Sequence, residues 1–169
     1  MTELFDRFIA FSKPFVEGAK NVFETMVFAK IEAQKPTLKK NQTSLGDVSA
    51  IMGLTGTIEI EGNTLDFKGM MVLSFPFGTY IKIASAMLMD EYTEFTDEIA
   101  DVGAEISNIV TGNAKRDLKG LGYNIDMAVP TTISGSQHRI KYPEKTHVIV
   151  IPMKCEHGDF FMELCYQDS

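Results

Sequence analysis

The stretch that decides the fold is GDVSAIMGLTGTIEIEGNTLDFKGMMVLSF, residues 46–75. Apolar residues alternate with polar or small residues along it, a period of two that is typical of β-strands with one buried face. The tripeptide Glu61-Gly62-Asn63 divides the stretch and supplies the glycine that tight hairpin turns favour. We therefore predict two antiparallel strands, over about residues 47–60 and 64–74.

Helical patterns precede this hairpin. The first 13 residues have helical spacing, and we expect Pro14 to interrupt or restart the helix because proline lacks a backbone N–H. A second helix is predicted from about Phe15 to Ile31, with its apolar residues at intervals of three and four facing inward. KPTLKKN, residues 35–41, is either a connector or the start of a short strand.

Two helices and three strands are predicted after the hairpin. Pro76 lies near the start of a helix that continues to about Met89. Thr96 can cap a further helix, over about residues 97–119, which Gly120 and Gly122 end. The strands are expected at Ala128 to Ser134, His147 to Cys155 and Phe160 to Tyr166, the last two joined at EHGD, residues 156–159.

This order of elements predicts an α+β fold, in which long helices cover one face of a mostly antiparallel sheet. A chain of 169 residues, 44% of them hydrophobic, is long enough for one substantial core. We expect a single domain over residues 1–169, with residues 1–13 as a helical extension, and methionines filling gaps in the core. An αββα half followed by an αβββ-like half suggests an internal duplication, although the two halves are not visibly similar in sequence.

The charge and hydropathy of the chain exclude several classes of function. The net charge is −7, and the only dense basic spot is Lys39-Lys40, so nucleic acid is not an expected partner. No stretch approaches the ~18 uninterrupted apolar residues that a membrane span needs. Glu3 and Asp6 precede any continuous apolar run, unlike in a signal peptide. A cytoplasmic location is therefore expected.

Common catalytic and metal-binding motifs are missing from the sequence. There is no glycine-rich phosphate loop, no GxSxG and no CxxC, and the three histidines lack metal-ligand spacing, so no metal site is expected in this chain. Cys155 and Cys165 lie ten residues apart. If His157-Gly158 forms a hairpin turn, Cys155 pairs near Phe160 instead, which argues against a disulfide.

One polar stripe remains as a candidate site. Asp101, Glu105, Asn108 and Gly112 are spaced by four, three and four residues, which places them on one line along a helix. At about 100° per residue, this line is roughly 130° from the centre of the apolar face. That apolar face consists of Ile99, Val102, Ile106, Ile109 and Val110. A carboxylate and an amide on a solvent-facing helix can act on another molecule.

Two further residues strengthen the stripe. Glycine inside a helix costs about 1 kcal/mol relative to alanine, so Gly112 suggests a packing or close-approach requirement. Pro130 falls where the next strand would begin or lie at a sheet edge.

The ordered set D-xxx-E-xx-N-xxx-G with a distant proline resembles the signature of the CheC/CheX/FliY family of chemotaxis phosphatases, and is most similar to its CheX branch. FVEGAKNVFETM, residues 15–26, followed by KPTLKKN, also resembles the opening helix and connector of CheX proteins. The resemblance extends from about Pro14 to Tyr166.

The resemblance implies a function for the stripe. In this family the helix enters the active site of the phosphorylated response regulator CheY, and the aspartyl phosphate is hydrolysed. Glu105 would pair with the active-site lysine of the regulator, and Asn108 would hold the attacking water in line with phosphorus. Asp101 and Gly112 would contact the partner. The chemistry fits, since a neutral amide positions water without adding negative charge beside a phosphate.

The resemblance also implies the surroundings of the site. The divalent metal, Mg²⁺, would belong to the receiver domain, and two copies of the chain would form a homodimer whose sheets join edge to edge. Some family members carry a second site on the N-terminal helix. Here that helix offers Glu17 and Asn21, spaced by four residues and not three, so a single site is expected.

Two other interpretations of the stripe remain. A non-catalytic adaptor would bind a receiver or another signalling protein through the same helix, but it would not need a water-orienting amide. A purely structural α+β domain would carry the stripe only as a wetted helix face.

Overall fold

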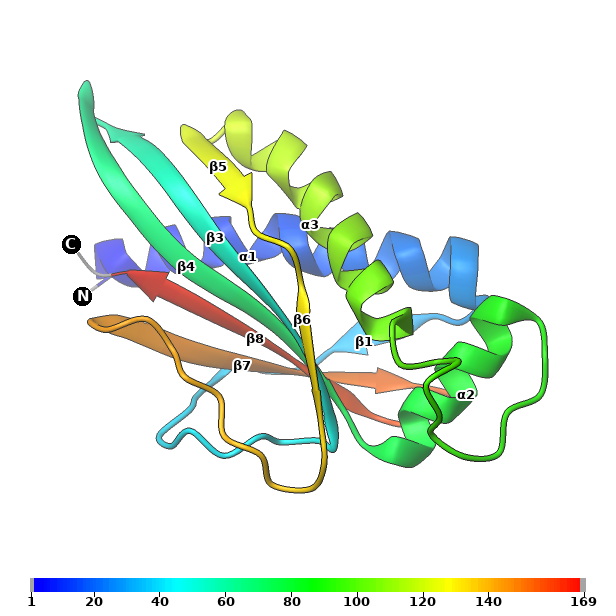
Figure 1. Cartoon of the computed structure of the whole chain (residues 1–169). Coiled ribbons are helices and arrows are strands. Elements are labelled where there is room, and N and C mark those ends of the chain that lie inside the picture. Colours follow the sequence, from blue (N-terminus) through cyan, green and yellow to red (C-terminus); the bar gives the residue numbers. More distant parts are fainter. Residues whose placement is uncertain (1, 168–169) are drawn as a thin grey trace.

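The computed structural model describes residues 2–167 of the chain. Within them an eight-stranded sheet, antiparallel throughout, carries long helices on one face (Figure 1). The α+β prediction is thus confirmed. Met1, Asp168 and Ser169 belong to the predicted domain of residues 1–169 but lie outside the described residues.

The helical elements are α1 (Thr2–Val22), the π-helical turn η1 (Phe23–Val27), α2 (Phe77–Leu88) and α3 (Val102–Lys119). The strands are β1 (Ile31–Ala33), β2 (Thr37–Leu38), β3 (Val48–Ile60), β4 (Asn63–Phe75), β5 (Tyr123–Met127), β6 (Thr131–Ser134), β7 (Thr146–Cys155) and β8 (Phe160–Gln167).

The two halves of the sheet have the same arrangement of strands, counted from each edge to the centre. Its order is β1-β7-β8-β4-β3-β5, with β2 also on β7 and β6 also on β3. The hairpins β3–β4 and β7–β8 meet at the centre through β4 and β8, and two short strands line the outer side of each hairpin. Each half is therefore one helix followed by four strands, with α2 as the connector. This topology supports the internal duplication that the sequence suggested.

The central hairpin is confirmed. β3 and β4 pair continuously from Val48 opposite Phe75 to Ile60 opposite Asn63. The two residues between them, Glu61 and Gly62, both have positive φ angles, of 51° and 80°. Two such residues are the requirement of the type I′ turn, whose twist matches that of the flanking strands.

The prediction for the N-terminal helices is wrong in two respects. α1 continues through Pro14, although proline removes one helical hydrogen bond. Packing outweighs this loss, because the neighbouring Phe11 and Phe15 are both fully buried and their tilted rings contact each other with a centroid distance of 5.1 Å. The helical segment also ends earlier than predicted, at Val27, and Ile31 already belongs to β1.

The helix predicted over residues 97–119 begins at Val102 instead, after a series of turns. An α-helix through this segment would join the Gly103 N–H to the Ile99 carbonyl. In the structure both groups bond to the hydroxyl of Tyr80, at 2.8 Å each. A long-range contact thus delays the start of α3.

The strand predicted from Ala128 to Ser134 is shorter, because only β6 lies within this range, and a separate strand, β5, precedes it without having been predicted. β5 ends at Met127 and β6 begins at Thr131, directly after Pro130. The proline has no N–H to donate to a neighbouring strand, which favours the break at this point. The predicted strands at β7 and β8 and the helix α2 are confirmed within a few residues.

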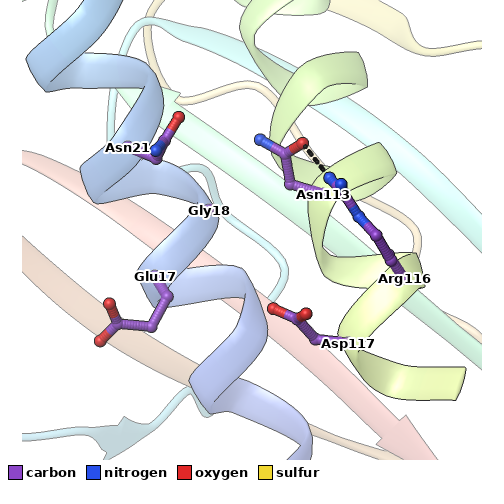
Figure 2. A pocket seen from close by; sticks show the side chains of 6 residues that line it. All are labelled: Glu17, Gly18, Asn21, Asn113, Arg116 and Asp117. Carbon is purple, nitrogen blue, oxygen red and sulfur yellow. Dashed lines mark hydrogen bonds between the residues drawn. The ribbon is translucent and has the colours of Figure 1, made fainter. Parts of the chain in front are cut away.

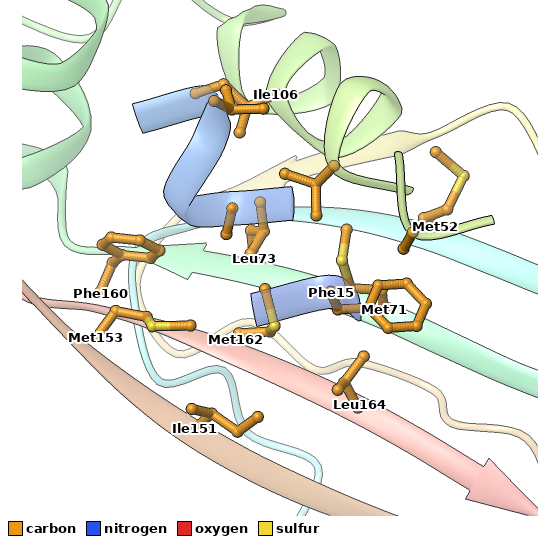
Figure 3. Close-up of a cluster of buried hydrophobic side chains, with 14 of the residues drawn as sticks. Phe15, Met52, Met71, Leu73, Ile106, Ile151, Met153, Phe160, Met162 and Leu164 are labelled. Carbon is orange, nitrogen blue, oxygen red and sulfur yellow. The ribbon is translucent and has the colours of Figure 1, made fainter. Parts of the chain in front are cut away.

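Helices α1 and α3 lie side by side on the sheet (Figures 1 and 2). Gly18 makes their close approach possible, because a Cβ atom at this position would lie 3.0 Å from the backbone oxygen of Val110. The main hydrophobic core lies between these two helices and the sheet, and Figure 3 shows part of it. There Phe15 of α1 and Ile106 of α3 face side chains such as Met71 of β4 and Leu164 of β8.

Methionines fill this core as predicted. Met52, Met71, Met153 and Met162 are fully buried, one on each of the four central strands β3, β4, β7 and β8. The unbranched side chain adapts to irregular gaps between helices and sheet.

A buried ion pair lies on the other face of the sheet. Glu163 alternates along β8 with residues of the main core, so it points away from the helices. Lys39 Nζ lies 3.2 Å from both of its carboxylate oxygens, and the Tyr142 hydroxyl donates to Oε1. The Lys39 and Glu163 side chains are 4% and 0% exposed. This pair therefore fastens the segments after β2 and before β7 onto the sheet.

We expect Glu163→Ala to lower the free energy of unfolding by about 3–5 kcal/mol, because it leaves the Lys39 ammonium buried without its counter-charge. The double variant Lys39→Met/Glu163→Leu should recover most of that loss, since apolar side chains of similar volume need no partner. Chemical denaturation of the three proteins measures both effects. A loss below about 1 kcal/mol in the single variant would contradict the role given to the pair.

Candidate functional site

Helix α3 presents the predicted polar stripe to solvent. Asp101, Glu105, Asn108 and Gly112 are all exposed. Its other side is anchored in the core by Val102, Ile106, Val110, Ala114 and Leu118, each at most 4% exposed. Because the anchoring residues recur at intervals of four, they hold one face of α3 against the core. The helix therefore cannot turn the polar stripe inward.

Glu105 and Asn108 occupy the first two turns of α3. The Glu105 N–H donates to the Asp101 carbonyl at 3.0 Å, so the backbone is already helical at the carboxylate. Within the described residues, neither the Glu105 nor the Asn108 side chain forms a hydrogen bond or an ion pair. Both polar groups are therefore available to a partner, and no rearrangement of this chain is needed to expose them.

The two ends of the stripe differ in what they contribute. Asp101 occupies the N-cap position of α3, but its carboxylate makes no capping hydrogen bond. A Cβ atom at Gly112 would meet no atom within 4 Å. Packing inside the chain therefore does not require glycine at this position.

Strands β5 and β6 border α3 at the sheet edge (Figure 1). Pro130 lies in the bend between them, and the preceding residue, Val129, is 86% exposed. Sequence reasoning missed Val129, because an isolated valine before proline gives no pattern that distinguishes an exposed side chain from a buried one.

A polar groove between α1 and α3 is separate from the stripe. Its lining residues are Glu17, Gly18, Asn21, Asn113, Arg116 and Asp117 (Figure 2). One guanidinium nitrogen of Arg116 donates to Asn113 Oδ1 at 3.1 Å. Neither Glu105 nor Asn108 lines this groove. The candidate site is therefore a projecting helix face, which suits insertion into a cavity of a partner better than enclosure of a small molecule.

Cys165 and His138 both lie in structural surroundings. Both cysteines are free, and burial raises the pKa of the Cys165 thiol to about 12, so this thiol stays protonated at neutral pH. His138 lies 2.7 Å from both the Gly135 carbonyl and Ser49 Oγ, on the side of the sheet away from the main helices. These contacts assign it a structural role.

The described residues form neither a metal-ligand cluster nor a membrane-spanning helix. In this part of the chain no group of three or more His, Cys, Asp and Glu side chains could hold a metal ion. None of the helices in residues 2–167 is long and apolar enough to cross a membrane.

The fold and the exposed stripe define a protein of the CheC-like class. The crystal structure of a CheC-like superfamily protein from Shewanella sp. PV-4 matches with a TM-score of 0.81 and 30% identity, covering 95% of this chain and 99% of the other. Residues 48–154 match the family of the chemotaxis phosphatase CheX. The chain belongs to the CheX family.

Two CheX relatives carry functional descriptions. The CheY-P phosphatase CheX of Thermotoga maritima is 30% identical over 92 residues, and the match spans only 54% of each chain. CheX of Borrelia burgdorferi, in a complex with CheY, beryllium trifluoride and Mg²⁺, has a TM-score of 0.76 and 25% identity, covering 94% of this chain and 98% of the other.

We expect Gly112→Ala to raise the free energy of unfolding by about 1 kcal/mol, because the added methyl group meets open space and alanine favours the helix. Thermal or chemical denaturation measures the change. Gly18→Ala is the matched comparison in α1 and should destabilise the fold, since its Cβ atom would press on the Val110 backbone. Destabilisation by Gly112→Ala would show that the chain itself requires this glycine.

Proposed function

We propose that this protein is a phosphatase that hydrolyses the aspartyl phosphate of a CheY-like response regulator in chemotaxis signalling. The main support is the position of Glu105 and Asn108, which match the family signature and stand exposed and unpaired on α3. The named activity of the Thermotoga relative and the presence of CheY in the Borrelia complex agree with this proposal. Beryllium trifluoride resembles a phosphoryl group in shape and charge.

Glu105 is the proposed docking residue. Its carboxylate would form a charge-assisted hydrogen bond with the lysine in the active site of the receiver domain. Because Glu105 has no partner in its own chain, docking would not first require an internal ion pair to break.

Asn108 is the proposed positioning group for water. The phosphorus of an acyl phosphate is already electrophilic, so the main requirement is a water molecule held in line with the bond that breaks. The amide can accept one hydrogen bond and donate another while remaining neutral. A carboxylate at this position would repel the phosphoryl oxygens.

The remaining parts of the site would come from the contact between the two proteins. Asp101 and Gly112, one turn to either side of the catalytic pair, would contact the receiver, and the missing side chain at Gly112 would allow its backbone to approach. The divalent metal, Mg²⁺, would be held by the receiver, where it would neutralise the phosphoryl charge. This chain would supply only the water-positioning and docking groups.

We expect Asn108→Ala to lower the dephosphorylation rate by about 10²-fold or more through loss of the positioned water. Glu105→Ala should mainly raise the receiver concentration needed for half-maximal rate, and Glu105→Lys should raise it further by charge repulsion. Phosphate release from a phosphorylated receiver, measured with substoichiometric protein, gives both quantities. It also tests the adaptor alternative, because an adaptor would bind the receiver without turnover.

The chain offers matched controls for this experiment. Asn113→Ala removes the same side chain from α3 outside the stripe, and Glu17→Ala removes an exposed carboxylate from α1. Both variants should retain the wild-type rate. Wild-type rates for Asn108→Ala and Glu105→Ala would contradict the site, and a loss of rate in Glu17→Ala would contradict the single-site proposal.

We further propose that two copies of the chain form a homodimer. The sheet has one edge formed by β1 and β2 and another formed by β5 and β6, and either could extend the sheet into a second copy. Sedimentation equilibrium at micromolar concentration should give the mass of two chains. A monomer mass under these conditions would contradict the proposal.

A further inference from the structure

The start of α3 lacks a side-chain cap from its own sequence. The first N–H groups of any helix have no intrahelical acceptor, and an Asp, Asn, Ser or Thr at the N-cap usually supplies one. Asp101 occupies this position without making such a hydrogen bond. The first turn, which carries Glu105, must therefore be held by another part of the chain.

The hydroxyl of Tyr80 in α2 supplies the missing cap. It accepts a hydrogen bond from the Gly103 N–H at 2.8 Å. As a donor it lies 2.8 Å from the Ile99 carbonyl and 2.9 Å from the Ala100 carbonyl. One buried hydroxyl thus joins the first turn of α3 to the turn before it.

The tyrosine ring is fixed on several sides. It packs edge-on against Phe75 at the end of β4 and against Phe95 in the segment before α3, with centroid distances of 5.5 and 5.4 Å. Gly103 lies against the ring, because a Cβ atom at this position would come within 3.0 Å of Tyr80 Cε2. The side chain is 1% exposed. The position of the hydroxyl is therefore set by the core and not by solvent.

The hydroxyl also keeps its proton. Burial is the main cause that raises the pKa of Tyr80 to about 12, so the group remains neutral over the physiological range. A neutral hydroxyl can donate and accept at once, as the contacts with Gly103 and Ile99 require.

We propose that Tyr80 is a positioning residue that sets the direction of the first turn of α3, and hence the orientation of Glu105 toward the receiver. The inference rests on the proposed phosphatase function and adds a residue to it. Gly103 lies two positions before Glu105 in the same turn, whereas Asn108 lies in the next turn, held by ordinary helical hydrogen bonds. Loss of the hydroxyl should therefore weaken docking more than the hydrolysis step.

The test is Tyr80→Phe, which removes one oxygen and keeps the ring. We expect the receiver concentration for half-maximal rate (KM) to rise about fivefold, the equivalent of one modest hydrogen bond, while kcat changes less than about twofold. In the same protein, hydrogen exchange of the Gly103 amide, followed by NMR, should become faster. A purely structural role would lower stability without this separation of KM from kcat.

Tyr123→Phe is the matched control. The Tyr123 hydroxyl lies 2.7 Å from that of Tyr166 in the core, in the strand that follows the far end of α3. This variant also loses one buried tyrosine hydrogen bond, but it should leave KM and the exchange of Gly103 unchanged. Gly103→Ala is a second, independent variant, which should raise KM by displacing the Tyr80 ring while its hydroxyl is retained.

A wild-type KM in Tyr80→Phe, or an equal rise in Tyr123→Phe, would overturn the inference. Unchanged Gly103 exchange in Tyr80→Phe would overturn it as well, because the cap itself would be dispensable. Failure of the proposed function has a different signature, since Asn108→Ala would then show the wild-type rate. In that case the role of Tyr80 in docking would be contradicted together with the proposed function. Faster hydrogen exchange of the Gly103 amide in Tyr80→Phe would still identify Tyr80 as the cap of α3.

Discussion

The close approach of α1 and α3 at Gly18 is the constraint on which the exposed face of α3 depends. Two long helices share one face of the sheet, and at this point a side chain on α1 would collide with the Val110 backbone. With the sheet beneath α3 and α1 beside it, the residues that remain exposed are those on the outer surface. The stripe from Asp101 to Gly112 lies there. Packing of the two helices thus decides which part of α3 can meet a partner.

A site on a projecting helix face makes different demands on the fold from those of an enclosed active site. An enclosed active site needs a cavity, several converging side chains and often a metal centre. Half of a shared active site needs only a rigid helix with the correct groups on its outer face. The rigidity comes from the apolar side of α3, and the charge and amide of Glu105 and Asn108 need no internal partner. Their lack of contacts within the chain is therefore consistent with a role between two proteins.

Sequence patterns predicted the elements whose cause is local. The β3–β4 hairpin follows from alternation and its glycine turn, and the exposure of Glu105 follows from helical spacing alone. Three features were not predictable in this way. The short strand β5 exists because β3 offers an edge to pair with. α1 continues through Pro14 because aromatic packing outweighs one hydrogen bond. α3 begins late because Tyr80, 23 residues before Gly103, intercepts its first hydrogen bonds.

The repeated topology allows one half to carry the proposed site alone. α1 and α3 open the two halves of the same topology, so each could in principle present a docking face. In α1, Glu17 and Asn21 are spaced by four residues and line the groove beside α3. Their helix also contributes the glycine that permits the close approach. Because α1 serves in packing, its Glu and Asn side chains need not have the three-residue spacing that the proposed catalytic pair has on α3. The repeated topology therefore allows α1 to serve as a support while α3 carries the residues that we propose act on a partner.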